Sequence, residues 1–251
     1  MIVARDLTKR FGKQDAVSAV SFAIPRGTVA GLLGGNGAGK STTMRLLAGY
    51  ILPDRGHAVI AGHDAGTAPM AARAALGYVP EAPSGFPHLT VHEFLRFTAE
   101  CRGLAGHRAR RAIDQTVECL DLGPALHRTL GILSKGWRQR AWLAQAILHE
   151  PPILLLDEPA DGLDPGQRAQ FRAYIRSVAS SRAVLLSTHI LEEAEALCDR
   201  LIVMREGRVI ADGPIGPLLD EHGRLGPAFA RLSTLGATLK PTSGAAGVAV
   251  P

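Results

Sequence analysis

The chain has little cysteine, few aromatic residues and no long apolar run. Its three cysteines, Cys101, Cys119 and Cys198, are widely spaced and form no C-x-x-C pair. This pattern indicates neither a disulfide framework nor a zinc site, and we expect reduced thiols. No stretch approaches about 18 consecutive apolar residues, and the opening MIVARDLTKRFG has no apolar signal core. The sequence therefore predicts neither a membrane-spanning helix nor a signal peptide.

The composition is that of a globular protein with a mild excess of positive charge. The 251 residues are 46% hydrophobic and 20% charged, and 28 basic residues are offset by 23 acidic ones. Such a chain can bury a sizeable core as one large domain or two lobes. The stretch ILSKGWRQRA, residues 132–141, concentrates a lysine, two arginines and a tryptophan. Composition alone leaves open a nucleic-acid patch, a membrane-surface patch or another anion site.

The apolar pattern alternates between strands and helices. Period-two alternation or continuous apolar runs predict strands in VSAVSFAI, TVAGLLG, PPILLLDEP and SRAVLLSTH, and helical spacing follows in STTMRLLAG and from Pro165 to Ser180. From about Leu89 to His149 the apolar residues recur at three- and four-residue intervals, which indicates a helical insert. This order predicts an α/β core that is split by a helical subdomain. The small-residue-rich segment 238–251 is expected to be a flexible tail.

The segment GGNGAGKST, Gly34–Thr42, matches G-x-x-x-x-G-K-[ST] and lies between a predicted buried strand and a helix. Its glycines allow backbone N–H groups to surround phosphates, and the following helix directs its positive end at them. We expect Lys40 to contact the β- and γ-phosphates and Ser41 to ligate magnesium. A plain glycine-rich turn is the alternative, but the strand–loop–helix context disfavours it.

A second pair of polar residues follows the apolar strand ILLLDEP. Asp157 and Glu158 are placed at the carboxyl end of that strand, where ligands bind in open α/β sheets. Alone, such a pair is more often a helix cap. Beside a phosphate loop, Asp157 is expected to hold Mg²⁺, and Glu158 to orient and deprotonate the water that attacks the γ-phosphate.

Six motifs together carry a family resemblance. The ordered series GGNGAGKST, YVPE, LSKGWRQR, LLLDEP, GLDP and STH, within Ile2–Gly213, resembles the nucleotide-binding subunits of ABC transporters. The resemblance implies an α/β fold: a P-loop NTPase core with a mixed, largely parallel sheet, an N-terminal antiparallel β region and an inserted α-helical subdomain. The ATPase domain is then expected at residues 1–237, with its core at 1–88 and 150–213, the helical subdomain at about 89–149 and a C-terminal helical extension at about 214–237.

The resemblance also assigns residues to ATP and Mg²⁺. Phe11 resembles the adenine-stacking aromatic, for which a core phenylalanine is the alternative, and Val17 resembles a residue beside the base or ribose. Catalysis is assigned to Glu158, His189 and Lys40. The metal ligands are Ser41, Glu81 and Asp157. The implied nucleotide-binding set is Phe11, Val17, Gly34, Gly35, Asn36, Gly37, Ala38, Gly39, Lys40, Ser41, Thr42, Ser134, Gly136 and Asp164.

Three of these residues would have ordinary roles without the resemblance. Glu81 stands where the family usually has glutamine, and a carboxylate can also ligate a hard cation. Asp164 resembles the dimer-facing loop aspartate, although its position before Pro165 alone predicts a turn or helix N-cap. His189 resembles the switch histidine that contacts the γ-phosphate, whereas a lone histidine is normally structural.

LSKGWRQR resembles the ABC signature, and Ser134 is also a predicted helix N-cap. In the family, the signature serine and glycine backbone of one subunit close over ATP held by another, which implies a head-to-tail dimer. Lys135 and Trp137 depart from the usual glycine and glutamine. This form is similar to the ATPases of type-2 exporters, the group with gliding-motility, sodium-efflux and copper-maturation relatives.

The resemblance predicts an ATPase subunit that powers transport, in the export direction, through separate transmembrane permease subunits. It is expected at the cytoplasmic face of the inner membrane, held there by those subunits, and no nucleic acid is expected as a partner. The competing class is a soluble ABC ATPase that acts on nucleic acid or ribosomes, which usually has two ATPase domains or a long coiled-coil insertion. A small-molecule phosphotransferase would not account for LSKGWRQR or STH.

Overall fold

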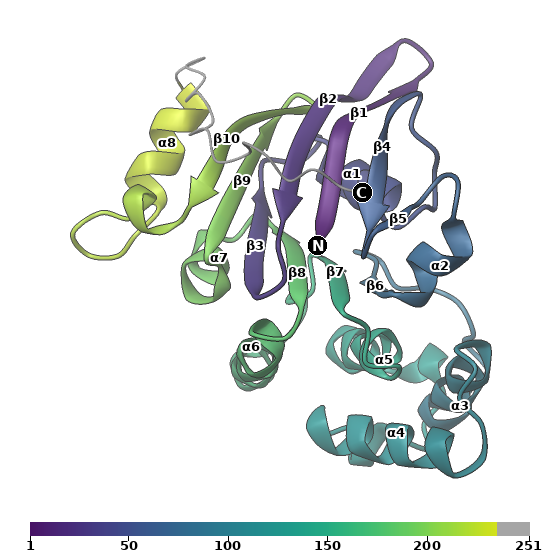
Figure 1. Cartoon of the computed structure of the whole chain (residues 1–251). Helices are drawn as coiled ribbons and strands as arrows, with labels where there is room; N and C mark the ends of the chain where they lie inside the picture. The colour runs from purple at the N-terminus through teal and green to yellow at the C-terminus, as the bar shows by residue number, and fades with distance from the viewer. Residues whose placement is uncertain (235–251) are drawn as a thin grey trace.

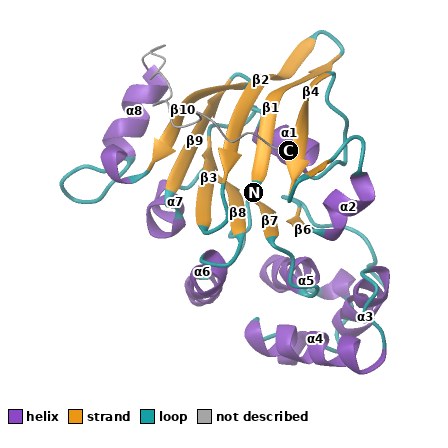
Figure 2. Cartoon of the chain, viewed as in Figure 1, coloured by secondary structure: helices purple, strands orange, loops and turns teal. Residues whose placement is uncertain are grey.

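The computed structural model describes residues 1–234, which form two β-sheets and the helices that cover them (Figures 1 and 2). The smaller sheet has the strand order β2-β1-β4-β5, and all its pairs are antiparallel. Its strands are β1 (Ile2–Phe11), β2 (Gln14–Ile24), β4 (Arg55–Ile60) and β5 (His63–Asp64). The expected tail at 238–251 lies outside the described residues.

The larger sheet has the order β10-β9-β3-β8-β7-β6. Its strands are β3 (Thr28–Leu33), β6 (Leu76–Val79), β7 (Ile153–Asp157), β8 (Ala183–Thr188), β9 (Arg200–Arg205) and β10 (Arg208–Pro214). The pairs from β9 through β3, β8 and β7 to β6 are parallel, and β10 runs antiparallel to β9. Because parallel strands end at the same edge, the loops after β3, β6, β7 and β8 meet there.

Both faces of the larger sheet are buried, each in its own apolar cluster. Along β7, Ile153 and Leu155 point into one cluster with the smaller sheet and α1 (Lys40–Leu47), while Leu154 and Leu156 point into the other. This alternation is the period of two expected for a strand that is covered on both sides. The second cluster is covered by α6 (Pro165–Ala179) and α7 (Leu191–Leu197) together with the helical insert.

The insert consists of three helices, which lie at one end of the molecule (Figure 1). They are α3 (Val91–Cys101), α4 (Gly106–Cys119) and α5 (Lys135–Ile147), with short 3-10 turns at Gly123–Ala125 and Leu130–Ile132. A capping box between Thr90 and Glu93 begins α3. The predicted fold class, including the antiparallel β region and the helical insert, is confirmed.

Short helices complete the fold. They are α2 (Pro69–Ala74), a 3-10 turn at Gly216–Leu218 and α8 (Gly226–Thr234). Within residues 1–234, none of the helices has the length and apolar character needed to span a bilayer. The exact domain boundaries drawn from the resemblance remain predictions.

Candidate functional site

The phosphate loop connects β3 to α1 at the edge where the parallel strands end. Gly37 and Gly39 have φ angles of 77° and 99°, a conformation that side-chain-bearing residues rarely adopt. A Cβ added at Gly39 would also lie 2.6 Å from the carbonyl oxygen of Ala16. Glycine is therefore required at this position by both backbone conformation and space.

Lys40 is buried at the end of the phosphate loop, where α1 begins. Its Nζ donates to the Gly34 carbonyl at 2.8 Å and to the Gly35 carbonyl at 3.3 Å, and it lies 3.8 Å from Glu158 Oε1. The ammonium group thus lies between the loop backbone and the carboxylate that follows β7. This brings together two residues that are 118 positions apart in the sequence (158 minus 40).

The predicted metal ligands lie close to one another. Ser41 Oγ lies 3.2 Å from Glu81 Oε2 and 3.3 Å from Asp157 Oδ1, and its one proton is shared between these two acceptors. Asp157 Oδ2 is buried without a hydrogen-bond partner in the described chain. Burial raises the pKa of Asp157, the hydrogen bonds from Ser187 and Ser41 oppose this rise, and the charges of Glu81 and Glu158 add to it.

These donors fit a hard divalent cation, because Mg²⁺ prefers one or two carboxylates with further oxygen ligands. A cation would also satisfy the unpartnered Asp157 oxygen. Among the described residues, no group of three or more His, Cys, Asp or Glu side chains has metal-site geometry. The fit therefore depends on two carboxylates and the Ser41 hydroxyl.

Glu158 and His189 form the second pair at this edge. His189 Nδ1 lies 3.0 Å from Glu158 Oε2, and an ionised carboxylate can only accept, so Nδ1–H donates. The φ of Glu158 is 48°, in the left-handed region. Such a conformation persists where surrounding contacts hold it and is frequent at functional sites. The two residues thus come together from the ends of adjacent strands β7 and β8.

Ser187 is a further functional candidate, which the sequence motifs did not predict as a site residue. Its hydroxyl donates to Asp157 Oδ1 at 2.5 Å and accepts from the Glu158 backbone N–H at 2.9 Å. It therefore holds both acidic residues at once. The signal lay in the sequence, because Ser187 begins the STH motif that drew attention to His189.

Phe11 and Val17 have opposite environments. Phe11 ends β1 with 53% of its surface exposed, which excludes the core role considered for it, and Lys9 Nζ lies 5.8 Å from its ring centroid. Val17 is fully buried in the cluster beneath the smaller sheet, and its place beside the base or ribose remains a prediction. The neighbouring Ala16 carbonyl, by contrast, packs directly against the phosphate-loop residue Gly39.

The signature residues begin α5 as predicted. Exposed Ser134 is the N-cap and accepts from the Trp137 N–H at 3.4 Å. Gly136 is buried where an added Cβ would lie 2.5 Å from Gln167 Oε1. The same Gln167 forms a capping box with Asp164 at the start of α6. The signature and the Asp164 loop are thus packed together within one chain.

The cations of the signature stretch are engaged within the chain. Lys135 Nζ pairs with Asp161 Oδ2 at 2.5 Å. Arg138 donates to the Leu133 carbonyl at 3.1 Å. The guanidinium of Arg140 stacks on Trp137 at 3.8 Å from the ring centroid. Each of these three cations therefore has a partner within the chain.

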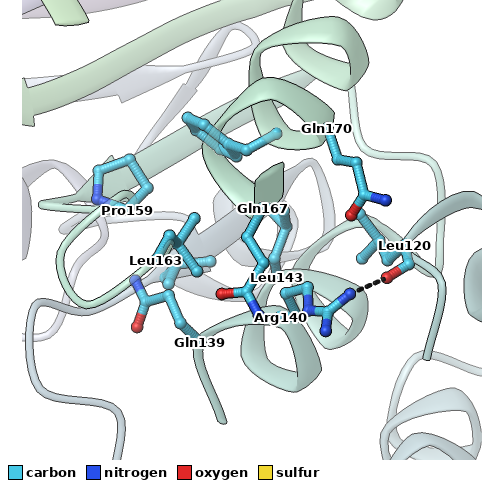
Figure 3. A pocket seen from close by; sticks show the side chains of 10 residues that line it. Leu120, Gln139, Arg140, Leu143, Pro159, Leu163, Gln167 and Gln170 are labelled. Carbon is cyan, nitrogen blue, oxygen red and sulfur yellow. Dashed lines mark hydrogen bonds between the residues drawn. The ribbon is translucent and has the colours of Figure 1, made fainter. Parts of the chain in front are cut away.

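Arg140 also lines a small pocket between α5, α6 and the loop before α6 (Figure 3). Its Nη1 donates to the Leu120 carbonyl at 3.2 Å, the bond drawn in the figure. The pocket holds about 10 Å³, room for a single water at most. Arg140 Nε and Gln139 Nε2 are buried without protein partners in the described chain.

Comparison with known proteins shows similarity to ABC transporter ATPases over most of the chain, beyond the six motifs. The family model described as "ABC transporter" matches residues 17–161. An uncharacterized ABC transporter ATP-binding protein of Bacillus subtilis, YxlF, is 36% identical over 88% of this chain and 74% of that protein. Nod factor export ATP-binding protein I of Bradyrhizobium diazoefficiens is 38% identical over 85% of this chain and 70% of that protein. A solved ATP-binding subunit of an ABC transporter superimposes with a TM-score of 0.85 at 32% identity, over 93% of this chain and 99% of that one.

Proposed function

The chain belongs to the ABC transporter family as an ATP-binding ATPase, and we propose that it powers export through separate membrane subunits. Family membership confirms the resemblance carried by the six motifs. ATPase domains of this family work with membrane subunits and dimerise. The roles of individual residues, the Mg²⁺ site, the form of the dimer and the direction of transport are proposals.

ATP is held at the edge where the parallel strands end. The phosphate-loop backbone N–H groups and Lys40 bind the β- and γ-phosphates, and exposed Phe11 stacks on the adenine. Base–aromatic stacking is worth about 1–3 kcal/mol and depends on the ring face, so phenylalanine is sufficient. Ser41, Asp157 and Glu81 would hold Mg²⁺, which supplies charge stabilisation to the phosphates.

Hydrolysis is assigned to the Glu158–His189 pair. Glu158 accepts a proton from the attacking water, since its carboxylate follows β7 beside Lys40. His189 donates to Glu158 through Nδ1, which orients the carboxylate and leaves the other side of the ring for the γ-phosphate. The 3.0 Å Glu158–His189 contact beside Lys40 is the observation that carries the proposal.

The second half of each ATP site comes from a second copy. Ser134 is exposed, and within the described residues no hydrogen bond or ion pair joins it to the phosphate loop. Its exposure and the resemblance to the ABC signature support a head-to-tail pair in which Ser134, the Gly136 backbone and Asp164 face the ATP of the other copy. The close packing of Gly136 against Gln167 keeps the signature and the Asp164 loop in one fixed arrangement.

Export is favoured by the name of the Nod factor export relative and by the signature form shared with type-2 exporters. The chain would then act at the cytoplasmic face of the inner membrane, bound to permease subunits. Affinity purification from native membranes should recover a polytopic membrane protein with the chain. Recovery of the chain alone would contradict the transport role.

Size-exclusion chromatography tests the ATP-driven dimer. Glu158→Gln should accumulate an ATP-bound dimer with little phosphate release, because ATP still closes the pair but is not hydrolysed. Adding Ser134→Arg should abolish the dimer while nucleotide binding by the monomer remains. A dimer that survives Ser134→Arg would refute the assignment in trans, and near-normal phosphate release by Glu158→Gln would remove Glu158 from catalysis.

A further inference from the structure

A partly exposed arginine, whose Nε is buried, and a buried glutamate face each other between α6 and α7 without forming a hydrogen bond. Arg168 Nε lies 3.9 Å from Glu193 Oε1, and neither atom has a hydrogen-bond partner in the described chain. Glu193 is only 4% exposed. Buried polar groups are nearly always hydrogen-bonded, and each exception requires an explanation. The proposed roles of the site residues do not use either side chain.

The other oxygen of Glu193 holds the turn that carries His189. Glu193 Oε2 accepts from the Thr188 hydroxyl at 3.3 Å, and Thr188 Oγ1 accepts from the Ile190 N–H at 3.0 Å. His189 lies between these two residues. The position of the Glu193 carboxylate therefore affects the backbone from which the imidazole reaches Glu158.

Arg168 belongs to the opposite element, the first turns of α6. Its backbone N–H donates to the Asp164 carbonyl at 2.9 Å, and the Asp164–Gln167 capping box fixes the start of the helix. A displacement of the Asp164 loop is thus transmitted to Arg168 by a short, hydrogen-bonded stretch of helix. Glu193 thus lies beside Arg168 through one carboxylate oxygen and bonds to Thr188, next to His189, through the other.

We propose that Glu193 is a positioning residue that couples α6 to the His189 turn. The proposal rests on the proposed function in one respect, namely that Asp164 faces the second copy. Contact at Asp164 shifts α6 by less than about 1 Å, which brings Arg168 Nε within the 2.7–3.2 Å hydrogen-bond range of Glu193 Oε1. The carboxylate then holds Thr188 more firmly, so that dimer formation stabilises the His189–Glu158 contact that the single chain already has.

The chain provides a matched control for this route. Arg176, two turns further along α6, donates through Nη2 to the Ala196 carbonyl at 2.6 Å. It also joins α6 to α7, but at the far end of α7 from Thr188. Arg168→Met and Arg176→Met each retain an apolar stem and remove the guanidinium. Arg168→Met removes a contact with Glu193, which bonds to Thr188 beside His189. Arg176→Met removes a contact with Ala196, which has no such bond to Thr188.

Steady-state ATPase measurements on the full chain test the coupling. Arg168→Met and Glu193→Gln should each lower kcat roughly 10- to 100-fold, the range expected when a catalytic group is misplaced by up to about 1 Å, with KM for ATP unchanged. Arg176→Met should retain the wild-type kcat. The double variant Arg168→Met/Glu193→Gln should be no slower than the slower single variant, because both remove one contact. Equal losses in Arg168→Met and Arg176→Met would mean general helix packing and would overturn the proposal.

Hydrogen exchange at the Ile190 amide gives a readout that does not need turnover. With ATP and magnesium present, Arg168→Met should speed exchange of this amide, whereas Arg176→Met should not. Wild-type exchange in Arg168→Met would overturn the proposal whatever the ATPase result. If Glu158→Gln proves active, the assignment of Glu158 fails, yet the exchange comparison still decides the role of Glu193.

Discussion

His189 Nδ1 donates to Glu158 Oε2 over 3.0 Å, which joins the residues that directly follow two adjacent strands, β7 and β8, into one proposed catalytic pair. The imidazole is half exposed, whereas the carboxylate is buried. The contact therefore joins a solvent-accessible imidazole ring to a buried carboxylate, and each limits the orientation of the other. Among the described residues, the Glu158 carboxylate contacts the His189 ring and the Lys40 ammonium group. These two side chains orient it.

His189→Ala is expected to lower phosphate release by about 10²- to 10³-fold, the usual cost of removing one preorganised donor from a charged transition state. ATP-driven dimerisation should persist, because the phosphate loop and the signature are unchanged. His189→Gln, which keeps one N–H donor, should lose less activity. Wild-type turnover in His189→Ala would contradict the assignment.

Glu81→Gln should retain ATP hydrolysis but require more magnesium. Glu81 Oε2 accepts from Ser41 beside Asp157, so the substitution removes one of two carboxylates from the proposed metal site. A magnesium titration of ATPase activity measures the shift. Glu100→Gln, which removes the same charge from the exposed face of α3, is the control. Superimposable titrations for Glu81→Gln and the wild type would contradict the prediction.

Gly136→Ala is expected to reduce the free energy of unfolding by about 1–3 kcal/mol and to weaken ATP-driven dimerisation. The added Cβ would lie 2.5 Å from Gln167 Oε1, so this side chain must leave its capping position, and 3.1 Å from the Gly162 carbonyl, which must give by a few tenths of an ångström. Gly123→Ala provides the control, because a Cβ there meets no atom within 4 Å. Urea denaturation should separate the two variants, and equal stability would contradict the packing argument.

His149 makes stability depend on pH. Burial, with the nearby charge of Arg102, lowers the pKa of this imidazole to about 4 from a usual value of 6.5. The unfolded chain therefore binds the proton more tightly, and the free energy of unfolding should fall as the pH drops from 6.5 towards 4. In His149→Gln this part of the pH dependence should disappear. Denaturation curves at pH 7 and pH 5 test the difference.

Much of the site could be predicted because its residues follow strands. The apolar run before Asp157 and the one before His189 each predicted a buried strand of the same sheet. Parallel strands end at one edge, so their next residues had to meet. The sequence order of the motifs was thus sufficient to place Lys40, Asp157, Glu158 and His189 together.

Other features of the site could not be predicted, because they depend on contacts between residues that are far apart in the sequence or on how strands pair. Val17 and Ala16 are adjacent, and only the pairing of β1 with β2 decides which one is buried. The charges of Arg138 and Arg140 predict an exposed basic patch, but carbonyls of preceding loops accept from both. Likewise, Lys135 meets Asp161 across 26 residues. Motifs could therefore locate these positions without predicting their contacts.

The helical insert has no hydrophobic core of its own. Residues of α3, α4 and α5 belong to the same buried cluster as one face of the larger sheet, together with α6 and α7. Neither part can lose its packing without exposing apolar surface of the other, so a single cooperative unfolding transition follows for both. The two tryptophans of the chain, Trp137 and Trp142, both lie in α5 and pack against this cluster. Their fluorescence therefore reports the unfolding of the catalytic sheet as well as that of the helix in which they lie.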